Sequence, residues 1–154
     1  MLLQIRMANI NDVKKLATLE TNAFAKDKFH ILTTKHYKYL LTKANAEIWI
    51  ICKKDNVIAS GIIFYNKKWS HCRLYSIAVN PDFQGQGLGT KLLNHIEDVA
   101  KKKGLTGIRQ EIRQDASDLL NRYLKKGYHV YQQKLNYYPD GIGCIKLKKA
   151  WLNV

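Results

Sequence analysis

A run of alternating glycines, Gln84-Gly85-Gln86-Gly87-Leu88-Gly89-Thr90, has residue types and a spacing that predict chemistry. It follows an apolar, strand-like run ending at Val79 and a turn at Asn80-Pro81-Asp82, and it opens into an amphipathic pattern ending at Gly104. The first N–H groups of a helix have no partner within the helix, and the helix dipole favours negative charge beside them. Glycines let an anion approach the backbone with no Cβ in the way. The segment therefore predicts an anion site suited to a phosphate group.

The spacing of the glycines excludes two common phosphate loops. A Walker loop needs Gly-Lys followed by Ser or Thr at a fixed interval, whereas the order here is Gly89-Thr90-Lys91. A dinucleotide fingerprint needs G-x-G-x-x-G, and Thr90 occupies the position of its last glycine. The segment matches Q-x-x-G-x-G instead, through Gln84, Gly87 and Gly89. In this it resembles the acetyl-CoA loop of the GNAT N-acetyltransferase superfamily, and the resemblance implies acetyl-CoA as the cofactor.

The resemblance continues after the glycine run. Glu111-Ile112-Arg113, Tyr123 and Gly127-Tyr128 are similar to the E-[VI]-R…Y-x-x-x-G-[FY] stretch of the bacterial ribosomal-protein alanine N-acetyltransferases. Residues 136–141 are similar to the N-Y-Y loop of that subgroup. The likeness covers residues 73–147 and, more faintly, the first strand and helix. It implies an acetyltransferase whose acceptor is the N-terminal α-amino group of a protein, with ribosomal proteins and the ribosome as possible partners.

Acetylation of an amine requires a base for the acceptor ammonium, donors for the developing oxyanion and an acid near the leaving thiolate. The resemblance implies Glu111 as the base and Tyr123 as the acid. Strand alternation places Arg109 and Arg113 on the same face as Glu111. There they would lower the pKa of Glu111 and favour proton removal through water. The structural alternatives are an ion pair with one of these arginines for Glu111, and packing at the strand interface for Tyr123.

The cofactor contacts expected from the resemblance are backbone groups of the strand and the corner. They are Ile77, Ala78, Val79, Gln84, Gly85, Gln86, Gly87, Leu88, Gly89 and Thr90. In this family a strand bulge frees an N–H near the thioester, and Ala78 or Val79 would supply it. Ala116 departs from the pattern, because the subgroup usually has an asparagine there that contacts the CoA arm. That contact is either lost or replaced.

Aromatic side chains are expected to flank the acceptor amine. Tyr137 and Tyr138 are predicted to wall the acceptor slot, and an exposed hairpin with cross-strand packing is the structural alternative. By family likeness, Phe24 and Phe29 line the opposite wall. The five histidines are scattered and form neither a metal pair nor a triad, so no metal is expected.

The residues above must be positioned by strands and a helix that lie close together. The pattern predicts the order β-α-α-β-β-β-α-β-α-β-β, with an antiparallel meander over residues 46–79 and a parallel strand–helix–strand unit around the glycine run. Helix caps are predicted at Asn9 or Asn11 and at Asp115 and Ser117, and a long strand from Tyr128 to Tyr137. The fold class is therefore α/β, a GNAT-like mixed sheet of about seven strands flanked by about four helices.

The length of 154 residues predicts a single domain over residues 1–154. The sequence has no apolar run of about 20 residues, so no membrane span is expected. Met1–Arg6 is interrupted too soon for a secretory signal. The three cysteines lie far apart, with a spacing that suits neither zinc nor a disulfide framework. They are expected to be buried small hydrophobes in a reducing cytoplasm.

The net charge of +14 results from 26 Lys and Arg against 12 Asp and Glu. It fits general solubility, attraction to RNA or a ribosome, or attraction to a phosphate-rich cofactor. The basic residues occur in scattered pairs, which disfavours a dedicated nucleic-acid arm. Two alternatives stay open: a small-amine (polyamine or antibiotic) acetyltransferase, and an RNA- or ribosome-associated module without catalysis. The positive charge disfavours cationic acceptors, and the absence of cysteine from the motif favours direct transfer in a ternary complex.

Overall fold

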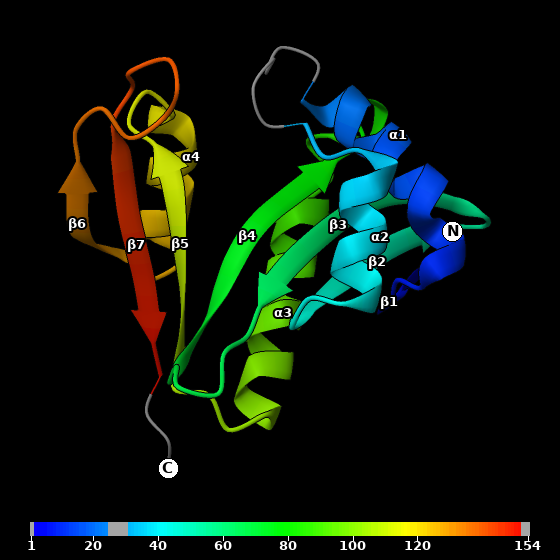
Figure 1. Cartoon of the computed structure of the whole chain (residues 1–154), viewed down its shortest axis with the longest axis horizontal. Coiled ribbons are helices and arrows are strands. Elements are labelled where there is room, and N and C mark those ends of the chain that lie inside the picture. The colour runs from blue at the N-terminus through cyan, green and yellow to red at the C-terminus, as the bar shows by residue number, and fades with distance from the viewer. Residues whose placement is uncertain (1, 25–30, 152–154) are drawn as a thin grey trace.

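The computed structural model describes residues 2–24 and 31–151 and contains one seven-stranded sheet. The elements follow one another in the predicted order (Figure 1). Their bounds are β1 Leu3–Met7, α1 Val13–Ala23, α2 Thr34–Thr42, β2 Ala46–Lys53, β3 Asn56–Phe64, β4 His71–Val79, α3 Leu88–Lys102, β5 Gly107–Arg113, α4 Ser117–Lys125, β6 His129–Lys134 and β7 Cys144–Ala150. Short 3-10 turns, η1 Ile10–Asp12 and η2 Pro81–Phe83, precede α1 and α3. The predicted fold class is confirmed.

The sheet has the strand order β1-β2-β3-β4-β5-β7-β6. The strands β2, β3 and β4 form the predicted antiparallel meander, and β4 and β5 are parallel as predicted. The strand β1 adds to the meander antiparallel to β2. The parallel pairing covers only residues 71–74 of β4 and 107–110 of β5. Beyond these residues the two strands diverge, so that the sheet opens like a V between them (Figure 1).

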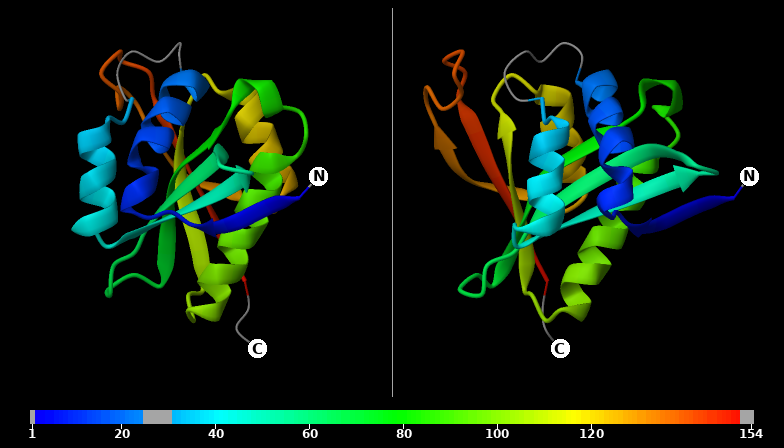
Figure 2. Two further views of the ribbon diagram at one scale, coloured as in Figure 1. Left: turned by 90° about the vertical axis from the view of Figure 1, so that its right-hand side faces the viewer. Right: turned by 45° about the vertical axis from the view of Figure 1, so that its right-hand side comes forward.

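Helices cover both faces of the sheet. The helices α1 and α2 lie on one face, and α3 and α4 lie on the other (Figure 2). The strand β3 is almost entirely buried, as its continuous apolar run predicts. An ideal Cβ at Gly61 would lie 2.7 Å from Cδ1 of Ile96, so the glycine lets the end of the Ile96 side chain pack directly on β3. This close contact fixes α3 against the middle of the sheet.

Local signals explain most of the element ends. Asn9 begins a capping box that involves Asp12, and Gly104 ends the α3 region with φ of +82°. The predicted caps of α4 are wrong, because Ala116 is the N-cap without a side-chain bond and Asp115 is paired with Arg113 instead.

The predicted strand from Tyr128 to Tyr137 is shorter than expected. The strand β6 comprises only His129–Lys134. Tyr128 is buried in the core, and Asn136 has φ of +50°, which turns the chain before Tyr137. The residues after Lys134 therefore form a loop at the open end of the V rather than a strand.

Candidate active site

The glycine corner joins η2 to the start of α3 and adopts the conformation that its glycines allow. Gly85 and Gly87 have φ of +81° and +77°, a region that other residues rarely adopt. An ideal Cβ at either position would meet nothing within 4 Å, so the backbone conformation, and not crowding, requires glycine. Gly89 has no such φ, and its Cβ would be only in ordinary contact with Val79 and Ile77.

The first turn of α3 leaves its backbone N–H groups available. Gly87 is the N-cap, and no side chain in the described part of the chain caps it. The bond from the N–H of Lys91 to the carbonyl of Gly87, at 3.0 Å, is the first of the helix, so the N–H groups of residues 88–90 precede it. The dipole of this 15-residue helix adds partial positive charge at that end. The corner therefore presents free N–H groups and partial positive charge to an anion.

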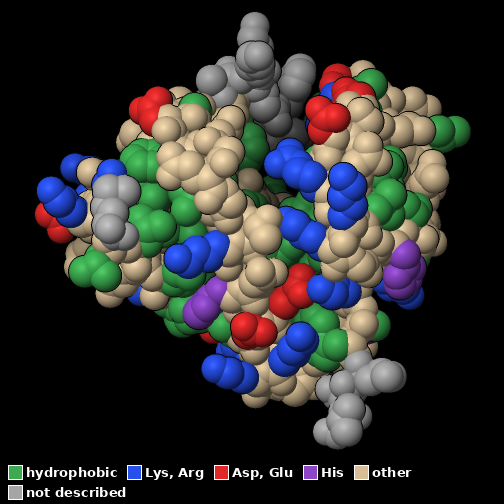
Figure 3. All heavy atoms as spheres, turned by 180° about the vertical axis from the view of Figure 1, so that it is seen from behind, with side chains coloured by type: hydrophobic (Ala, Val, Ile, Leu, Met, Phe, Trp, Pro, Cys, Tyr) green, Lys and Arg blue, Asp and Glu red, His purple; other side chains and the backbone are tan. Residues whose placement is uncertain are grey.

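Lys126, at the end of α4, adds a positive charge that was not predicted to be at this site. Its Nζ donates a hydrogen bond of 2.7 Å to Oγ1 of Thr90 in the first turn of α3. Burial, with the nearby charge of Arg122, lowers the pKa of Lys126. Figure 3 shows the α3 and α4 face of the molecule, where Lys and Arg side chains gather near the middle. This contact was not predictable from the sequence, because Lys126 and Thr90 are 36 residues apart and only the fold brings them together.

The outer edge of β4 carries backbone groups that face the opening. The N–H of Asn80 bonds to the carbonyl of Ile58 in β3 at 2.9 Å, so Asn80 and, by alternation, Ala78 direct their backbone groups toward β3. Ile77 and Val79 direct theirs to the other side, where the pairing with β5 has ended. Of the two residues predicted to supply an N–H, this geometry favours Val79. The bulge itself lies earlier, at Tyr75, because Leu74 and Ser76 pair with the consecutive residues Ile63 and Ile62.

Glu111 lies on β5 and is held by three side chains. The hydroxyl of Tyr137 donates to it at 2.6 Å, Arg73 lies at 3.3 Å and Nζ of Lys146 lies at 3.2 Å. The burial of Glu111 by itself would raise its pKa. The hydrogen bond from Tyr137 and the charges of Arg73 and Lys146 outweigh burial, and the pKa of Glu111 is lowered. The carboxyl group is therefore ionised at neutral pH.

The partners of Glu111 differ from those expected, although the direction of the pKa shift is as predicted. Arg109 packs over the ring of Trp69 at 4.4 Å, and Arg113 pairs with Asp115 and Asp140. Neighbouring strands lie about 4.8 Å apart, whereas residues i and i+2 of one strand are about 6.6 Å apart. Cross-strand residues are therefore nearer, and Lys146 is directly opposite Glu111 in the register with β7. A single sequence does not reveal this register.

Tyr123 lies on the other face of the sheet. It is buried with 8% of its surface exposed, within the cluster under α3 and α4 that also contains Ile108 and Ile112 of β5. Its ring makes an edge contact with that of Tyr128, with 5.3 Å between centroids. Burial raises the pKa of Tyr123 to about 12, so its hydroxyl is protonated at neutral pH. Alternation along β5 puts Glu111 on the opposite face from this cluster.

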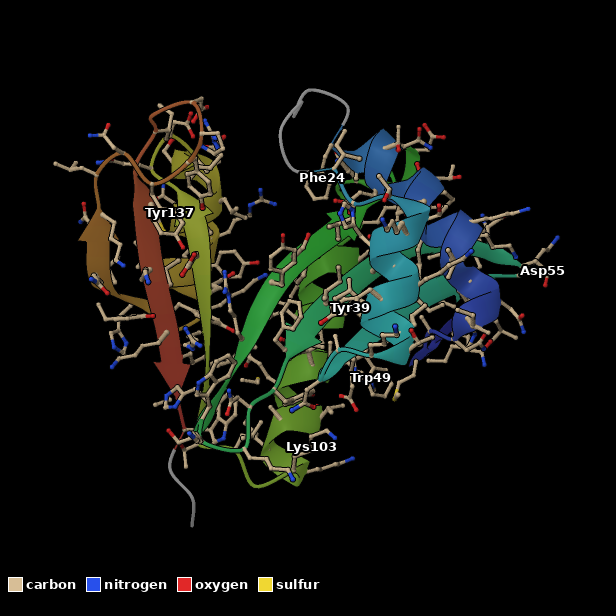
Figure 4. The ribbon with its side chains drawn as sticks, in the orientation of Figure 1. Phe24, Tyr39, Trp49, Asp55, Lys103 and Tyr137 are labelled. Atoms are coloured by element: carbon tan, nitrogen blue, oxygen red, sulfur yellow. The ribbon has the colours of Figure 1, made fainter. Side chains whose placement is uncertain are left out.

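Aromatic residues lie on both sides of the open end of the V. Figure 4 shows Phe24 at the end of α1 on one side and Tyr137 on the other. The rings of Tyr137 and Tyr138 are in edge contact, and the backbone N–H groups of both bond to the carbonyl of Ile142. The hydroxyl of Tyr137 also reaches Glu111, a contact that its expected role as a wall did not include. Phe29, predicted to be part of the opposite wall, lies outside the described residues.

Within residues 2–24 and 31–151, no group of three or more His, Cys, Asp or Glu side chains is arranged to hold a metal ion. In the same ranges, no helix combines the length and apolar character needed to cross a bilayer.

Part of the chain is similar in sequence to curated proteins. Ribosomal protein bS18 alanine N-acetyltransferase of Escherichia coli is 38% identical over 70 residues, which are 46% of this chain and 47% of that protein. The corresponding enzyme of Haemophilus ducreyi is 30% identical over 87 residues, 56% of this chain and 59% of that protein. The chain thus aligns with about half of the length of these curated relatives.

Solved structures resemble the whole chain. The crystal structure of the ribosomal-protein-S18-alanine N-acetyltransferase from Escherichia coli has a TM-score of 0.87 at 23% identity and covers 99% of this chain and 96% of that one. The PaiA N-acetyltransferase from Thermoplasma acidophilum, solved in complex with coenzyme A, has a TM-score of 0.78 at 15% identity, with 98% and 100% covered. At these identities the likeness establishes the fold. The model of the acetyltransferase (GNAT) family matches residues 11–128, and the chain therefore belongs to the GNAT acetyltransferase family.

Proposed function

We propose that the protein transfers the acetyl group of acetyl-CoA to the N-terminal α-amino group of a protein. The observation that carries the proposal is the position of Glu111. This ionised carboxylate lies on the strand that borders the V, across from the β4 edge that leads to the uncapped start of α3. The names of the aligned relatives support a protein acceptor, and a ribosomal protein is the first to test.

The cofactor would be held mainly by backbone groups. The N–H groups of the corner, residues 84–90, would bind the pyrophosphate, and Ile77 and Val79 would bind the arm that extends toward the V. Bound acetyl-CoA supplies an activated thioester at that place. Ala116 offers no side-chain hydrogen bond, so we expect the arm to be held without the contact that an asparagine makes there in related enzymes.

Glu111 would attract the acceptor ammonium and accept its proton. A carboxylate of lowered pKa is a weak direct base, so we assign the transfer to a water molecule between the amine and Glu111. The neutral amine then attacks the thioester carbonyl, a C–N bond forms and the C–S bond breaks. Tyr123, protonated because its pKa is raised to about 12, would donate a proton to the leaving thiolate from the opposite face of the sheet. The remaining proton of the new amide nitrogen leaves to solvent.

The cysteines favour direct transfer over an acetylated enzyme. Cys52, Cys72 and Cys144 are free and buried. Burial raises the pKa of each of the three thiols, that of Cys72 to about 12. A protonated, buried thiol is a poor nucleophile. Such buried thiols also suit a reducing compartment, and we expect the reaction to take place in the cytoplasm.

The test is acetylation of N-terminal peptides with acetyl-CoA, compared with polyamines and aminoglycosides. Glu111→Gln should lower kcat/KM for peptides by at least about a hundredfold, the lower end of the contribution of a positioned acid or base, and Tyr123→Phe should lower kcat comparably. CoA should still raise the melting temperature of both variants, which separates lost chemistry from lost folding. Turnover of small amines but not of peptides would contradict the proposed acceptor, and full activity of both variants would contradict the assigned roles.

A further inference from the structure

A groove borders the V on the α2 side of the sheet. It lies between the C-terminal end of α2 and the neighbouring parts of β3 and β4, and its lining residues are mostly aromatic or basic. Those that matter for the argument are Tyr39, Lys43, Tyr65, Trp69, Arg73 and Tyr75. Figure 4 shows Tyr39 on α2, well below the open end of the V where Phe24 and Tyr137 lie. The groove is therefore separate from the expected acceptor walls.

Arg73 connects this groove to Glu111. One of its terminal nitrogens lies 3.3 Å from the carboxylate, and its guanidinium carbon lies 5.8 Å from the centroid of the Tyr75 ring in the groove. The Nε atom of Arg73 is buried and has no hydrogen-bond partner among the described residues. The Arg73 side chain as a whole is 31% exposed, so a ligand in the groove can reach the rest of its guanidinium group.

The charges along this path have a definite pattern. Lys43 is exposed at the end of α2 that faces the groove, and the lining residues in the described ranges include no Asp or Glu. Arg109 adds a further positive charge behind Trp69, over whose ring it packs. Behind the groove, the carboxylate of Glu47 accepts a hydrogen bond from the hydroxyl of Tyr65 and is paired with Lys103. From the anionic carboxylate of Glu111, the path itself passes between cations and aromatic rings.

We propose that the groove binds the acceptor polypeptide after its first residue, with a preference for Asp or Glu at the second to fourth positions. The inference rests on the proposed function. An acceptor whose ammonium lies beside Glu111 advances about 3.3 Å per residue when extended, so these side chains reach Arg73 and then Lys43. Such a peptide is positive at its first residue and negative after it, which matches the two signs of the path. A nucleic acid offers phosphates along its whole length, and the carboxylate of Glu111 repels them.

The test uses peptides that share an N-terminal alanine and differ only at positions two to four, with Asp, Ser or Lys there. The Asp peptide should have a KM about threefold to tenfold lower than the Ser peptide, the range for one or two partly exposed charge pairs, and the Lys peptide a higher one. The kcat values should be similar, because contacts remote from the reacting atoms bind the ground state and the transition state alike.

Lys43→Glu should remove or reverse this order, and Lys38→Glu is the matched control. Both lysines are exposed on or beside α2, and both substitutions change the net charge equally, but Lys38 does not line the groove. Equal KM values for the three peptides, or the same profile in both variants, would overturn the inference and leave the proposed function intact. Failure of the wild type to acetylate any peptide would overturn both. The inference would be overturned in favour of nucleic acid by two results together. The three peptides would have equal KM values, and the affinity for an RNA oligonucleotide would be lowered by Lys43→Glu but not by Lys38→Glu.

Discussion

Gly87 offers the sharpest test of the cofactor site, because a matched control lies at the other end of the same helix. Gly87 begins α3 with φ of +77°, and Gly104 follows its end with φ of +82°. An ideal Cβ at either position would meet nothing within 4 Å. Gly87→Ala and Gly104→Ala therefore impose the same backbone strain without a clash. Only the first places a methyl group among the N–H groups proposed to bind phosphate.

The expected magnitudes follow from this geometry. A left-handed conformation costs alanine about 1–2 kcal/mol relative to glycine, which for a domain of this size lowers the melting temperature by about 2–8 °C. Both variants should lose stability to this extent. A hydrogen bond to a charged group contributes about 1.5–3 kcal/mol, so loss of one good contact in Gly87→Ala should weaken CoA binding at least about tenfold. The affinity of Gly104→Ala for CoA should be unchanged.

Thermal unfolding with and without CoA, together with calorimetric titration, measures both effects. At a CoA concentration of about 100 times the wild-type Kd, binding stabilises the folded state by about 2.7 kcal/mol. For a tenfold weaker site the same concentration gives about 1.4 kcal/mol. The CoA-induced shift should thus be roughly halved in Gly87→Ala and retained in Gly104→Ala. Equal shifts in the two variants would refute the argument that the corner holds the phosphates.

Three further predictions concern individual side chains. Tyr137→Phe removes the hydroxyl that bonds to Glu111 and should therefore raise the pKa of Glu111. The acid limb of the pH profile of kcat/KM should then move to higher pH. An unmoved limb would exclude Glu111 as the titrating group. Lys126→Met removes an ammonium group beside the first turn of α3. In steady-state kinetics it should raise the KM for acetyl-CoA about threefold to tenfold and leave the KM for peptide unchanged. A change in the peptide KM alone would disprove this prediction. The hydrogen bond from Arg6 lowers the pKa of Asp12. The ion pair therefore stabilises the fold at pH values above 3.8, the ordinary pKa of the carboxyl group, and this stabilisation is lost as the pH falls below that value. Asp12→Asn should cost about 1 kcal/mol near neutral pH and flatten the acid end of the stability curve in denaturant titrations, whereas an equal loss of stability at all pH values would contradict this linkage.

The order of elements was predictable because each element has a local signal. Periodic apolar residues identify α3, the turn residues identify the meander, and Gly104 identifies the end of a helix. The errors occur where a tertiary contact competes with a local preference. Asp115 has the residue type of a helix cap, but its carboxylate is bound by Arg113. Tyr128 has a strand-forming side chain, but it is buried in the core instead, and its hydroxyl bonds to Glu97 at 3.0 Å.

The candidate site was predictable only as far as its backbone. The corner can be read from the spacing of its glycines, and Glu111 can be assigned by resemblance. The groups that set the pKa of Glu111 come from three other parts of the chain, namely Arg73, Tyr137 and Lys146. Alternation along one strand suggests only Arg109 and Arg113. The sequence predicts that β4 is parallel to β5, but it does not give the register of β4 or of β7 against β5. The sign of the pKa shift was nevertheless correct, since the charged side chains that contact Glu111 are basic.

The opening of the sheet has an identifiable cause in β4. The last residue of β4 that pairs with β5 is Leu74, and the next residue, Tyr75, is the extra residue of a bulge against β3. A bulge bends its strand and increases its twist, so β4 turns away from β5 directly after the bulge begins. The divergence leaves the backbone groups of Ile77 and Val79 at a free edge, while the hydrogen bonds from β4 to β3 resume. One inserted residue therefore creates the V and also places Tyr75 in the groove beside Arg73.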